Sequence, residues 1–154
     1  MQYKDVFLEV LSKCLEELTG LEFLLEYQGQ DSKFISKKDI TSQISIFGPE
    51  HEGMLIINID KNDINLLYKK IENDELEEDG FLIEDFLGEL TNIISGKFIE
   101  FLDIEITPSI PFIHFGKIEY STMRKNNFDI INIRQKDGIN FFVYIYLTEL
   151  EKDF

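Results

Sequence analysis

The spacing of apolar residues along this chain changes in a fixed order, and that order restricts the fold more than any other feature. Spacings of three and four residues, typical of one buried helix face, occur near the N-terminus and twice in the middle of the chain. Alternating or continuous apolar runs, typical of strands, fill the intervals. The order helix, strands, two helices, strands predicts an α+β fold with a largely antiparallel β-sheet covered by helices. A chain of 154 residues has room for one hydrophobic core, so residues 1–154 are expected to form a single domain.

The individual elements can be placed from these patterns. A first helix is expected over residues 1–18, ending at Thr19-Gly20, and further helices over 64–71 and 81–102. Strands are expected over residues 21–28, 40–47, 54–59, 104–107, 112–120, 128–135 and 139–148. Gly48-Pro49 and Lys136-Asp137-Gly138 have the composition of turns. The segment Asn73–Asp79 has five acidic residues in seven positions and is interpreted as a solvated linker.

The charge balance excludes several classes of partner. The chain has 15 basic and 30 acidic residues, a formal net charge of −15. Such a field repels phosphate backbones and anionic lipid headgroups, so we expect neither nucleic acid nor a membrane surface as a partner. The longest apolar run, Phe141–Leu147, is too short to span a bilayer, and no apolar segment led by Arg or Lys opens the chain. A single cysteine precludes an intramolecular disulfide, and a cytoplasmic location is expected.

Most catalytic signatures are absent from the sequence. There is no phosphate-binding Gly-rich loop, no nucleophile elbow and no dinucleotide turn. Cys14 lies within a helical apolar stripe and is interpreted as a small core residue. His51 and His114 are the only histidines, and neither has a metal-ligand spacing, so both are interpreted as structural. We therefore expect no metal ion or other cofactor bound by the chain itself.

The segment from Gly88 to Gly96, in the middle of the strongest predicted helix, is unusual. Glycine inside a helix costs about 1 kcal/mol relative to alanine, so two glycines here need another reason. On a helical wheel Glu89 and Asn92 project from one face, Gly96 continues that ridge, and Gly88 and Ser95 flank it. Small residues let another backbone or a ligand approach closely. The pattern is typical of a helix that enters a partner's site, but a solvated face with glycine used for packing is an equally good reading of the spacing alone.

The same residues carry a family resemblance. Glu89-Leu90-Thr91-Asn92-Ile93-Ile94-Ser95-Gly96 is similar to the E-x-x-N-x-x-x-G signature of the chemotaxis phosphatases of the CheC/CheX/FliY group, and most similar to its CheX form. The segment from Pro108 to Gly116 resembles the Pro-containing stretch that follows this helix in CheX-like domains. The resemblance extends over most of the chain, although the diagnostic part is only the stretch that starts at Glu89.

The resemblance implies a function and roles for two residues. Members of this group remove the phosphoryl group from the aspartate of CheY-type response regulators by inserting this helix into the receiver's active site. By this resemblance Asn92 would orient the attacking water, and Glu89 would pair with the receiver's active-site lysine. Gly88, Ser95 and Gly96 would form the partner-docking face. Mg²⁺ would be supplied by the partner receiver domain, so the chain would need no cofactor of its own.

One departure concerns the subfamily. CheC and FliY types usually have two such motifs, whereas the earlier predicted helix here has no E-x-x-N pattern. A single motif is similar to the CheX pattern, and the resemblance to CheX implies a homodimer formed by joined sheets. The apolar strand Phe141–Leu147 would suit burial in such a dimer, and it is equally well explained as a central strand of a monomer.

Three functions therefore remain open from the sequence. The first is a phosphatase of phosphorylated CheY-type response regulators. The second is a CheX-like docking module that binds a receiver or a flagellar switch component without appreciable catalysis. The third is an unrelated α+β interaction domain, which requires the motif to be a coincidence. Replacement of Asn92 separates the first two, because it would remove catalysis while sparing binding only in a phosphatase.

Overall fold

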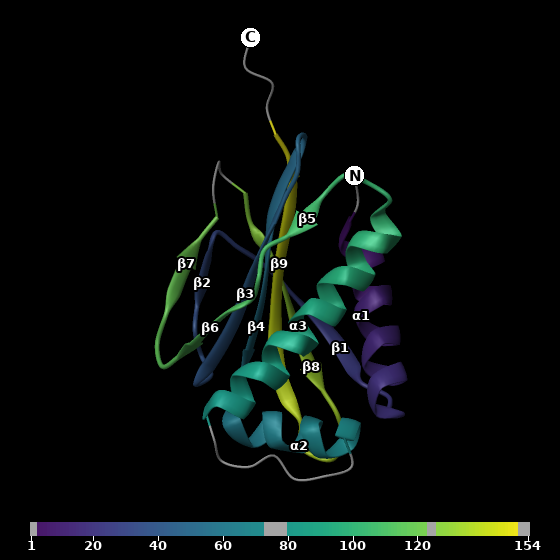
Figure 1. The fold of residues 1–154 in the computed structure, drawn as a ribbon, viewed down its shortest axis with the longest axis vertical. Helices are drawn as coiled ribbons and strands as arrows, with labels where there is room; N and C mark the ends of the chain where they lie inside the picture. Colours follow the sequence, from purple (N-terminus) through teal and green to yellow (C-terminus); the bar gives the residue numbers. More distant parts are fainter. Residues whose placement is uncertain (1–2, 73–79, 123–125, 151–154) are drawn as a thin grey trace.

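The structure is a computed structural model that describes residues 3–72, 80–122 and 126–150. Its elements follow the predicted order of helix, strands, two helices and strands (Figure 1). In chain order they are α1 (Tyr3–Thr19), β1 (Leu24–Asp31), β2 (Lys33–Ile35), β3 (Ile40–Phe47), β4 (His51–Ile59), α2 (Lys61–Glu72), α3 (Gly80–Leu102), β5 (Thr107–Pro108), β6 (Phe112–Phe115), β7 (Glu119–Ser121), β8 (Phe128–Arg134) and β9 (Asn140–Glu149).

A seven-stranded antiparallel sheet forms the middle of the molecule. Its strands lie in the order β1-β8-β9-β4-β3, and both β5 and β6 pair with the remaining edge of β3. The predicted fold class, an antiparallel sheet covered by helices, is confirmed. The apolar strand β9 lies between β8 and β4 and pairs with both. Its composition is thus explained by a central position within one chain, and the homodimer stays a prediction that this strand does not support.

Helices α1 and α3 cover one face of the sheet, and α2 lies across one end of it (Figure 1). Their apolar stripes face the strands, as their helical spacing predicts. Phe7 of α1 and Phe98 of α3 meet edge to face, with ring centroids 4.9 Å apart. The main core contains the fully buried residues Phe7, Leu11, Leu15, Ile44, Leu55, Ile57, Ile59, Ile64, Leu67, Leu87, Ile94, Phe98, Ile131, Ile133, Phe141, Val143 and Ile145.

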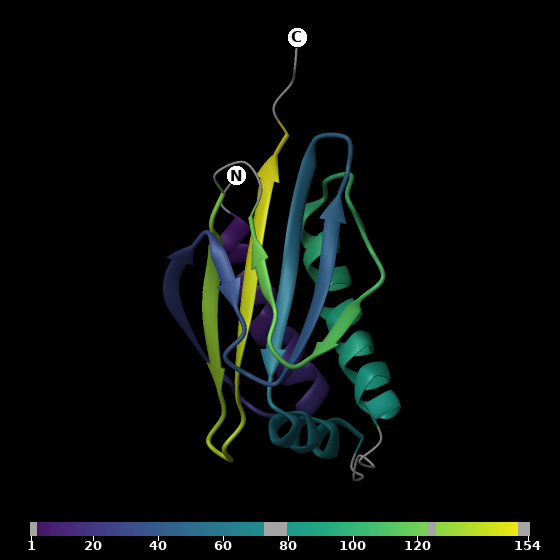
Figure 2. The same cartoon turned by 90° about the vertical axis from the view of Figure 1, so that its left-hand side faces the viewer.

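The small sheet of β2 and β7 covers part of the opposite face, and Figure 2 views the molecule from that side, with α1 behind the large sheet. Beneath it lies a second, mainly aromatic core of Phe34, Ile56, Phe128, Tyr144 and Tyr146. Phe34 comes from β2, and its ring meets the Tyr144 ring edge to face at 4.7 Å. The sheet is therefore buried on both faces along its central strands, which explains why β8 and β9 are apolar on both sides.

Local sequence signals explain several chain reversals. The first helix ends where predicted, because Gly20 adopts a φ of +72° and its N–H donates to the Glu16 carbonyl at 2.7 Å. The turn between β8 and β9 uses Gly138 at a φ of +102°, and the Gln135 N–H donates to the Ile139 carbonyl at 2.9 Å. The predicted end of the first helix and the predicted turn at residues 136–138 are both confirmed.

Other boundaries differ from expectation. Residues 112–120 were expected to form one strand, but the chain turns at Gly116, where φ is +96°, and separates β6 and β7 into different sheets. Residues 104–107 form little strand, since β5 contains only Thr107 and Pro108. The first strand starts three residues later than expected, at Leu24. Strand β2 was not expected, and the predicted linker Asn73–Asp79 lies outside the described residues.

Candidate functional site

Helix α3 presents the candidate site on its exposed face. Its buried face is held by apolar residues that recur at helical spacing and are at most 2% exposed: Ile83, Leu87, Leu90, Ile94 and Phe98. Glu89 and Asn92 are both exposed and lie three residues apart, so they project from neighbouring turns of one face. The two residues predicted to be catalytic are thus available to a partner, on a helix anchored along its other side.

A shallow hollow of about 590 Å³ lies between α3 and the chain that leads into β6. Its lining residues are Glu84, Asp85, Gly88, Glu89, Asn92, Pro111 and Ile113. One wall is therefore the exposed face of α3, and the other is the segment of residues 111–113, which approaches the helix from the edge of the sheet (Figure 1). The structure brings Glu89, Asn92 and Gly88 together around one concave surface.

The predicted docking residues fall in different surroundings. A Cβ atom added at Gly88 would lie 3.9 Å from the side chain of Pro111, which is an ordinary van der Waals contact, so the packing of the two walls does not require glycine there. A Cβ atom at Gly96 would meet nothing within 4 Å, and Gly96 is exposed. The packing of the free protein therefore does not require glycine at position 96.

Ser95 differs from its expected position. Its side chain is fully buried, and its hydroxyl donates to the Asn92 carbonyl at 3.1 Å. Thr91, one turn earlier, is also fully buried. Thr91 faces the sheet, since its hydroxyl lies 2.7 Å from that of Ser42 on β3, and Ser95 follows it by four residues on the same side of the helix. The structure corrects the assignment of Ser95 to the exposed docking face.

The hollow has a strongly acidic lining. Glu84, Asp85 and Glu89 contribute three carboxylates, and among the described residues no lysine or arginine lines it. A free phosphate ester would be repelled from such a surface, whereas a group that arrives with its own cations would be attracted. Asp85 and Glu89 are four residues apart, and like charges at this spacing destabilise an isolated helix by a few tenths of a kcal/mol. Sequence reasoning missed Glu84 and Asp85, although this unfavourable pair was a signal for them.

Glu89 also borders a second, smaller cavity. This crevice of about 100 Å³ lies where α1, α2 and α3 meet, and its lining residues are Leu18, Ile71, Glu72, Phe86, Glu89, Leu90 and Ile93. Glu89 therefore stands on the ridge between a polar hollow and an apolar crevice. Such a position supports its methylene groups on one side and leaves the carboxylate open to a partner.

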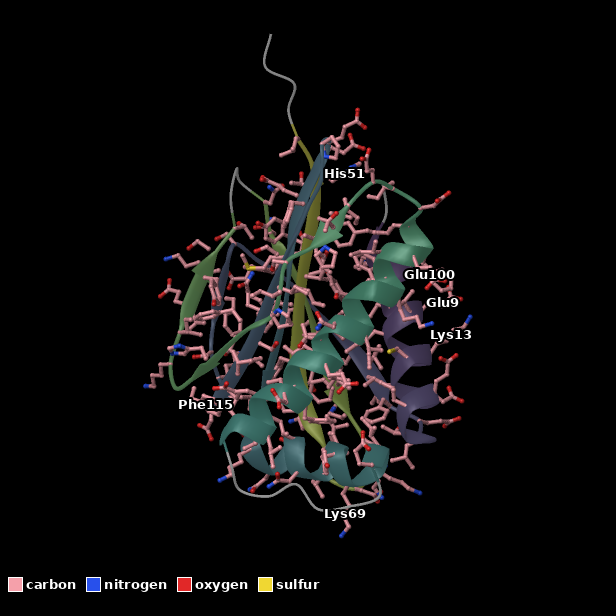
Figure 3. The ribbon with its side chains drawn as sticks, in the orientation of Figure 1. Glu9, Lys13, His51, Lys69, Glu100 and Phe115 are labelled. Atoms are coloured by element: carbon pink, nitrogen blue, oxygen red, sulfur yellow. The ribbon has the colours of Figure 1, made fainter. Side chains whose placement is uncertain are left out.

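The other residues considered in the sequence, Cys14, His51 and His114, lie outside the hollow. Cys14 is buried, and burial raises the pKa of its thiol, which confirms its interpretation as a core residue. His114 lies on β6, with Nε2 3.2 Å from the Lys117 carbonyl oxygen. His51 begins β4 at the far end of the β3–β4 hairpin, away from the N-terminal half of α3 (Figure 3). Within the described ranges, no group of three His, Cys, Asp or Glu side chains is placed to hold a metal ion.

A search of the described helices finds none that is both long enough and apolar enough to cross a membrane.

Comparisons with known proteins give consistent results. The family model described as "Chemotaxis phosphatase CheX" matches residues 40–133, a stretch that includes β3, the whole of α3 and the second wall of the hollow. No curated protein is similar enough in sequence to match the chain.

Several solved structures share this fold. The chemotaxis protein CheX from Vibrio vulnificus is 19% identical with a TM-score of 0.79, over 96% of this chain and 100% of that one. The chemotaxis protein CheX from Desulfovibrio desulfuricans is 17% identical with a TM-score of 0.73, over 96% of this chain and 100% of that one. The CheX of Borrelia burgdorferi, solved in a complex with CheY, BeF₃ and Mg²⁺, is 21% identical with a TM-score of 0.68, over 96% of this chain and 99% of that one. The chain belongs to the CheX family of chemotaxis phosphatases.

Proposed function

We propose that this protein removes the phosphoryl group from the phosphorylated aspartate of a CheY-type response regulator. Asn92 orients the attacking water, and Glu89 pairs with the receiver's active-site lysine. The observation that carries the proposal is the exposure of Glu89 and Asn92 on adjoining turns of α3, lining one hollow in a chain of the CheX family. The complex of a CheX with CheY, from Borrelia burgdorferi, supports a receiver domain as the partner.

The chemistry of phosphoryl transfer suits such a sparse site. Its transition state needs a positioned nucleophile and stabilised charge, and little covalent help from protein groups. The amide of Asn92 can both donate to and accept from a water molecule, and it adds no negative charge near the phosphoryl oxygens. A carboxylate at position 92 would be the fourth on this surface, after Glu84, Asp85 and Glu89, and the phosphoryl group would repel it. A neutral amide is therefore the appropriate group at position 92.

The acidic hollow favours a phosphoryl group that is already neutralised. In a receiver, Mg²⁺ and a lysine accompany the acyl phosphate, so the partner brings positive charge to a surface that has none of its own among the described lining residues. The Mg²⁺ would be the receiver's, and Glu89 would meet the lysine. This arrangement explains why the docking surface is acidic although the reacting group is an anion. Receiver domains are cytoplasmic, and we expect the same compartment for this protein.

The decisive experiment measures phosphate release from a phosphorylated CheY-type receiver in the presence of Mg²⁺. We expect wild-type protein to accelerate release and Asn92→Ala to reduce the acceleration on the order of 100-fold, because the water loses its orienting group. Asn62→Ala is the matched control, since it makes the same change at an exposed position of α2 outside the hollow. Glu89→Gln is expected to weaken receiver binding, measured with a receiver loaded with beryllofluoride and Mg²⁺.

The alternative is a docking module with the same surface and little catalysis. It predicts that wild-type protein binds the receiver, that phosphate release is not accelerated, and that Asn92→Ala changes neither measurement. Acceleration that survives in Asn92→Ala would refute the role given to this residue. An absence of both binding and acceleration across a panel of receivers would refute the proposed partner class.

A further inference from the structure

A buried hydrogen bond connects the functional helix to the sheet directly beneath the Glu89–Asn92 pair. The hydroxyl oxygens of Thr91 on α3 and Ser42 on β3 lie 2.7 Å apart, and both residues are fully buried. The Thr91 hydroxyl also lies 2.7 Å from the Leu87 carbonyl, to which only the threonine can donate its proton. The Ser42 hydroxyl must therefore be the donor to Thr91. The direction of the bond is fixed by this chain of two donors.

This hydrogen bond is directional, whereas most of the contacts around it are not. The rest of the α3 face that meets the sheet is mainly apolar, and apolar contacts are non-directional, so they tolerate small rotations and translations of a helix. A hydrogen bond between two buried hydroxyls tolerates neither, because its strength falls steeply when distance or angle departs from the optimum. Thr91 immediately precedes Asn92 and follows Glu89 by two residues. Fixing Thr91 therefore fixes the direction in which both functional side chains leave the helix.

Ser42 also holds the other wall of the hollow. In the pairing of β3 with β6, Ser42 lies opposite Ile113, which lines the hollow together with Pro111. The side chain of Ser42 thus anchors the helix, while its backbone lies in register with the segment that faces the helix. The two walls of the hollow are attached to the same residue of the sheet.

We propose that Ser42 and Thr91 are positioning residues, which set the rotation of α3 and hence the approach of Glu89 and Asn92 to the partner's phosphoryl group. The catalytic part of this inference rests on the proposed function. The geometric part, that the hydroxyl pair fixes the setting of the helix, stands on the contacts of the free protein alone.

The test compares four variants. Thr91→Val removes the hydroxyl and leaves the Ser42 donor without its acceptor, so its melting temperature is expected to fall. The double variant Ser42→Ala/Thr91→Val removes both polar groups, which is often nearly neutral for stability, so its melting temperature is expected to return close to that of the wild type. Thr91→Ser keeps the hydroxyl and is the conservative rescue. Thr19→Val is the matched control, because the Thr19 hydroxyl likewise donates to a carbonyl four residues earlier, in α1, and Thr19 does not line the hollow.

A positioning role and a purely stabilising role give different kinetics of phosphate release from the receiver. If the pair positions the helix, the double variant keeps a kcat lowered on the order of tenfold despite its recovered melting temperature, and KM changes less. Thr91→Ser and Thr19→Val keep the wild-type kcat. If kcat follows the melting temperature through the whole series, so that the double variant is fully active, the inference is overturned.

A second measurement keeps the inference testable if the proposed function fails. The side-chain amide resonances of Asn92 and the Cα shifts of residues 88, 89 and 93–96, which leave out the substituted position and its backbone neighbours, can be recorded by NMR in the free protein. We expect the double variant to displace these resonances and Thr91→Ser to restore them. Wild-type protein without phosphatase activity would refute the proposed function only, whereas unchanged resonances in the double variant would refute the role of the hydroxyl pair.

Discussion

Replacement of Gly96 by alanine is expected to act with opposite signs on stability and on function. Gly96 lies inside α3, six residues before its end, and a Cβ atom there would meet no atom within 4 Å. No packing cost therefore offsets the gain in helix propensity, which is about 1 kcal/mol for glycine to alanine in a helix interior. For a protein of this size that gain corresponds to a rise in melting temperature of about 2–4 °C.

The functional effect follows from the ridge on which Gly96 lies. Gly96 continues the line of Glu89 and Asn92, so under the proposed function a side chain at position 96 would extend toward the docked receiver. Gly96→Ala is expected to weaken binding of the phosphorylated receiver modestly, and Gly96→Leu to weaken it much more. Lys97→Leu is the control. Lys97 lies close enough to Cys14 of α1 for its positive charge to offset part of the rise that burial causes in the pKa of the thiol, so Lys97 is on the side of α3 that faces α1.

Two assays test the predicted effects of the Gly96 substitutions on stability and on binding. Thermal unfolding followed by circular dichroism measures the stability change, and titration of the receiver loaded with beryllofluoride and Mg²⁺ measures the affinity. A lower melting temperature in Gly96→Ala would refute the reasoning about helix propensity in open space. Wild-type affinity and phosphate release in Gly96→Leu would show that the partner does not contact this part of the ridge.

Three further predictions concern the scaffold, and urea denaturation measures each of them. Gly53→Ala is expected to lower the free energy of unfolding by about 3 kcal/mol, because its Cβ would lie 2.3 Å from the Tyr146 carbonyl oxygen on β9; stability equal to that of the wild type would contradict this. Asn58→Ala is expected to cost about 3 kcal/mol, because the buried amide accepts from two backbone N–H groups of the loop before β3; a loss below 1 kcal/mol would mean that water replaces it. Burial raises the pKa of the Asp63 carboxyl above its value in the unfolded chain. Between these two pKa values the folded protein keeps a proton that the unfolded chain has released, so the free energy of unfolding falls as pH rises from the lower pKa to the higher one. Asp63→Asn should therefore be more stable than the wild type at pH 7 and lose this advantage below about pH 4; an advantage independent of pH would refute the assignment.

The helix that carries the candidate site could be predicted from sequence because its features are local. Helical spacing fixes which residues share a face, so Glu89 and Asn92 had to project together whatever the helix packed against. The far wall of the hollow is not a local feature. Pro111 and Ile113 reach α3 only because β6 pairs with β3, some 70 residues earlier in the chain. No periodicity in the sequence records that pairing.

The misplacement of Ser95 and the omission of β2 have related causes. Ser95 is seven residues after Gly88, so a helical wheel places the two on nearly the same side. Ser95 is nevertheless fully buried and Gly88 only half-buried, because the neighbours of a helix change along its length. Strand β2 has only three residues, and its burial of Phe34 depends on pairing with β7, far away in the sequence. The burial of Ser95 and the existence of β2 both depend on tertiary contacts, so neither could be predicted from the local sequence.

The central position of β9 has a consequence for how the protein is made. Strand β4 can pair with β3 early, but it obtains its second partner only when β9 has been synthesised, and roughly 90 residues separate Gly53 from its pairing position opposite Leu147. A ribosome adds that length in about 5–20 seconds, during which the apolar edge of β4 and the underside of α3 lack their final cover. The helix that carries Glu89 and Asn92 therefore emerges before β8 and β9, and the sheet that it packs against is complete only after both strands have been made. Nascent chains of this fold should be good clients for chaperones that bind exposed strand edges.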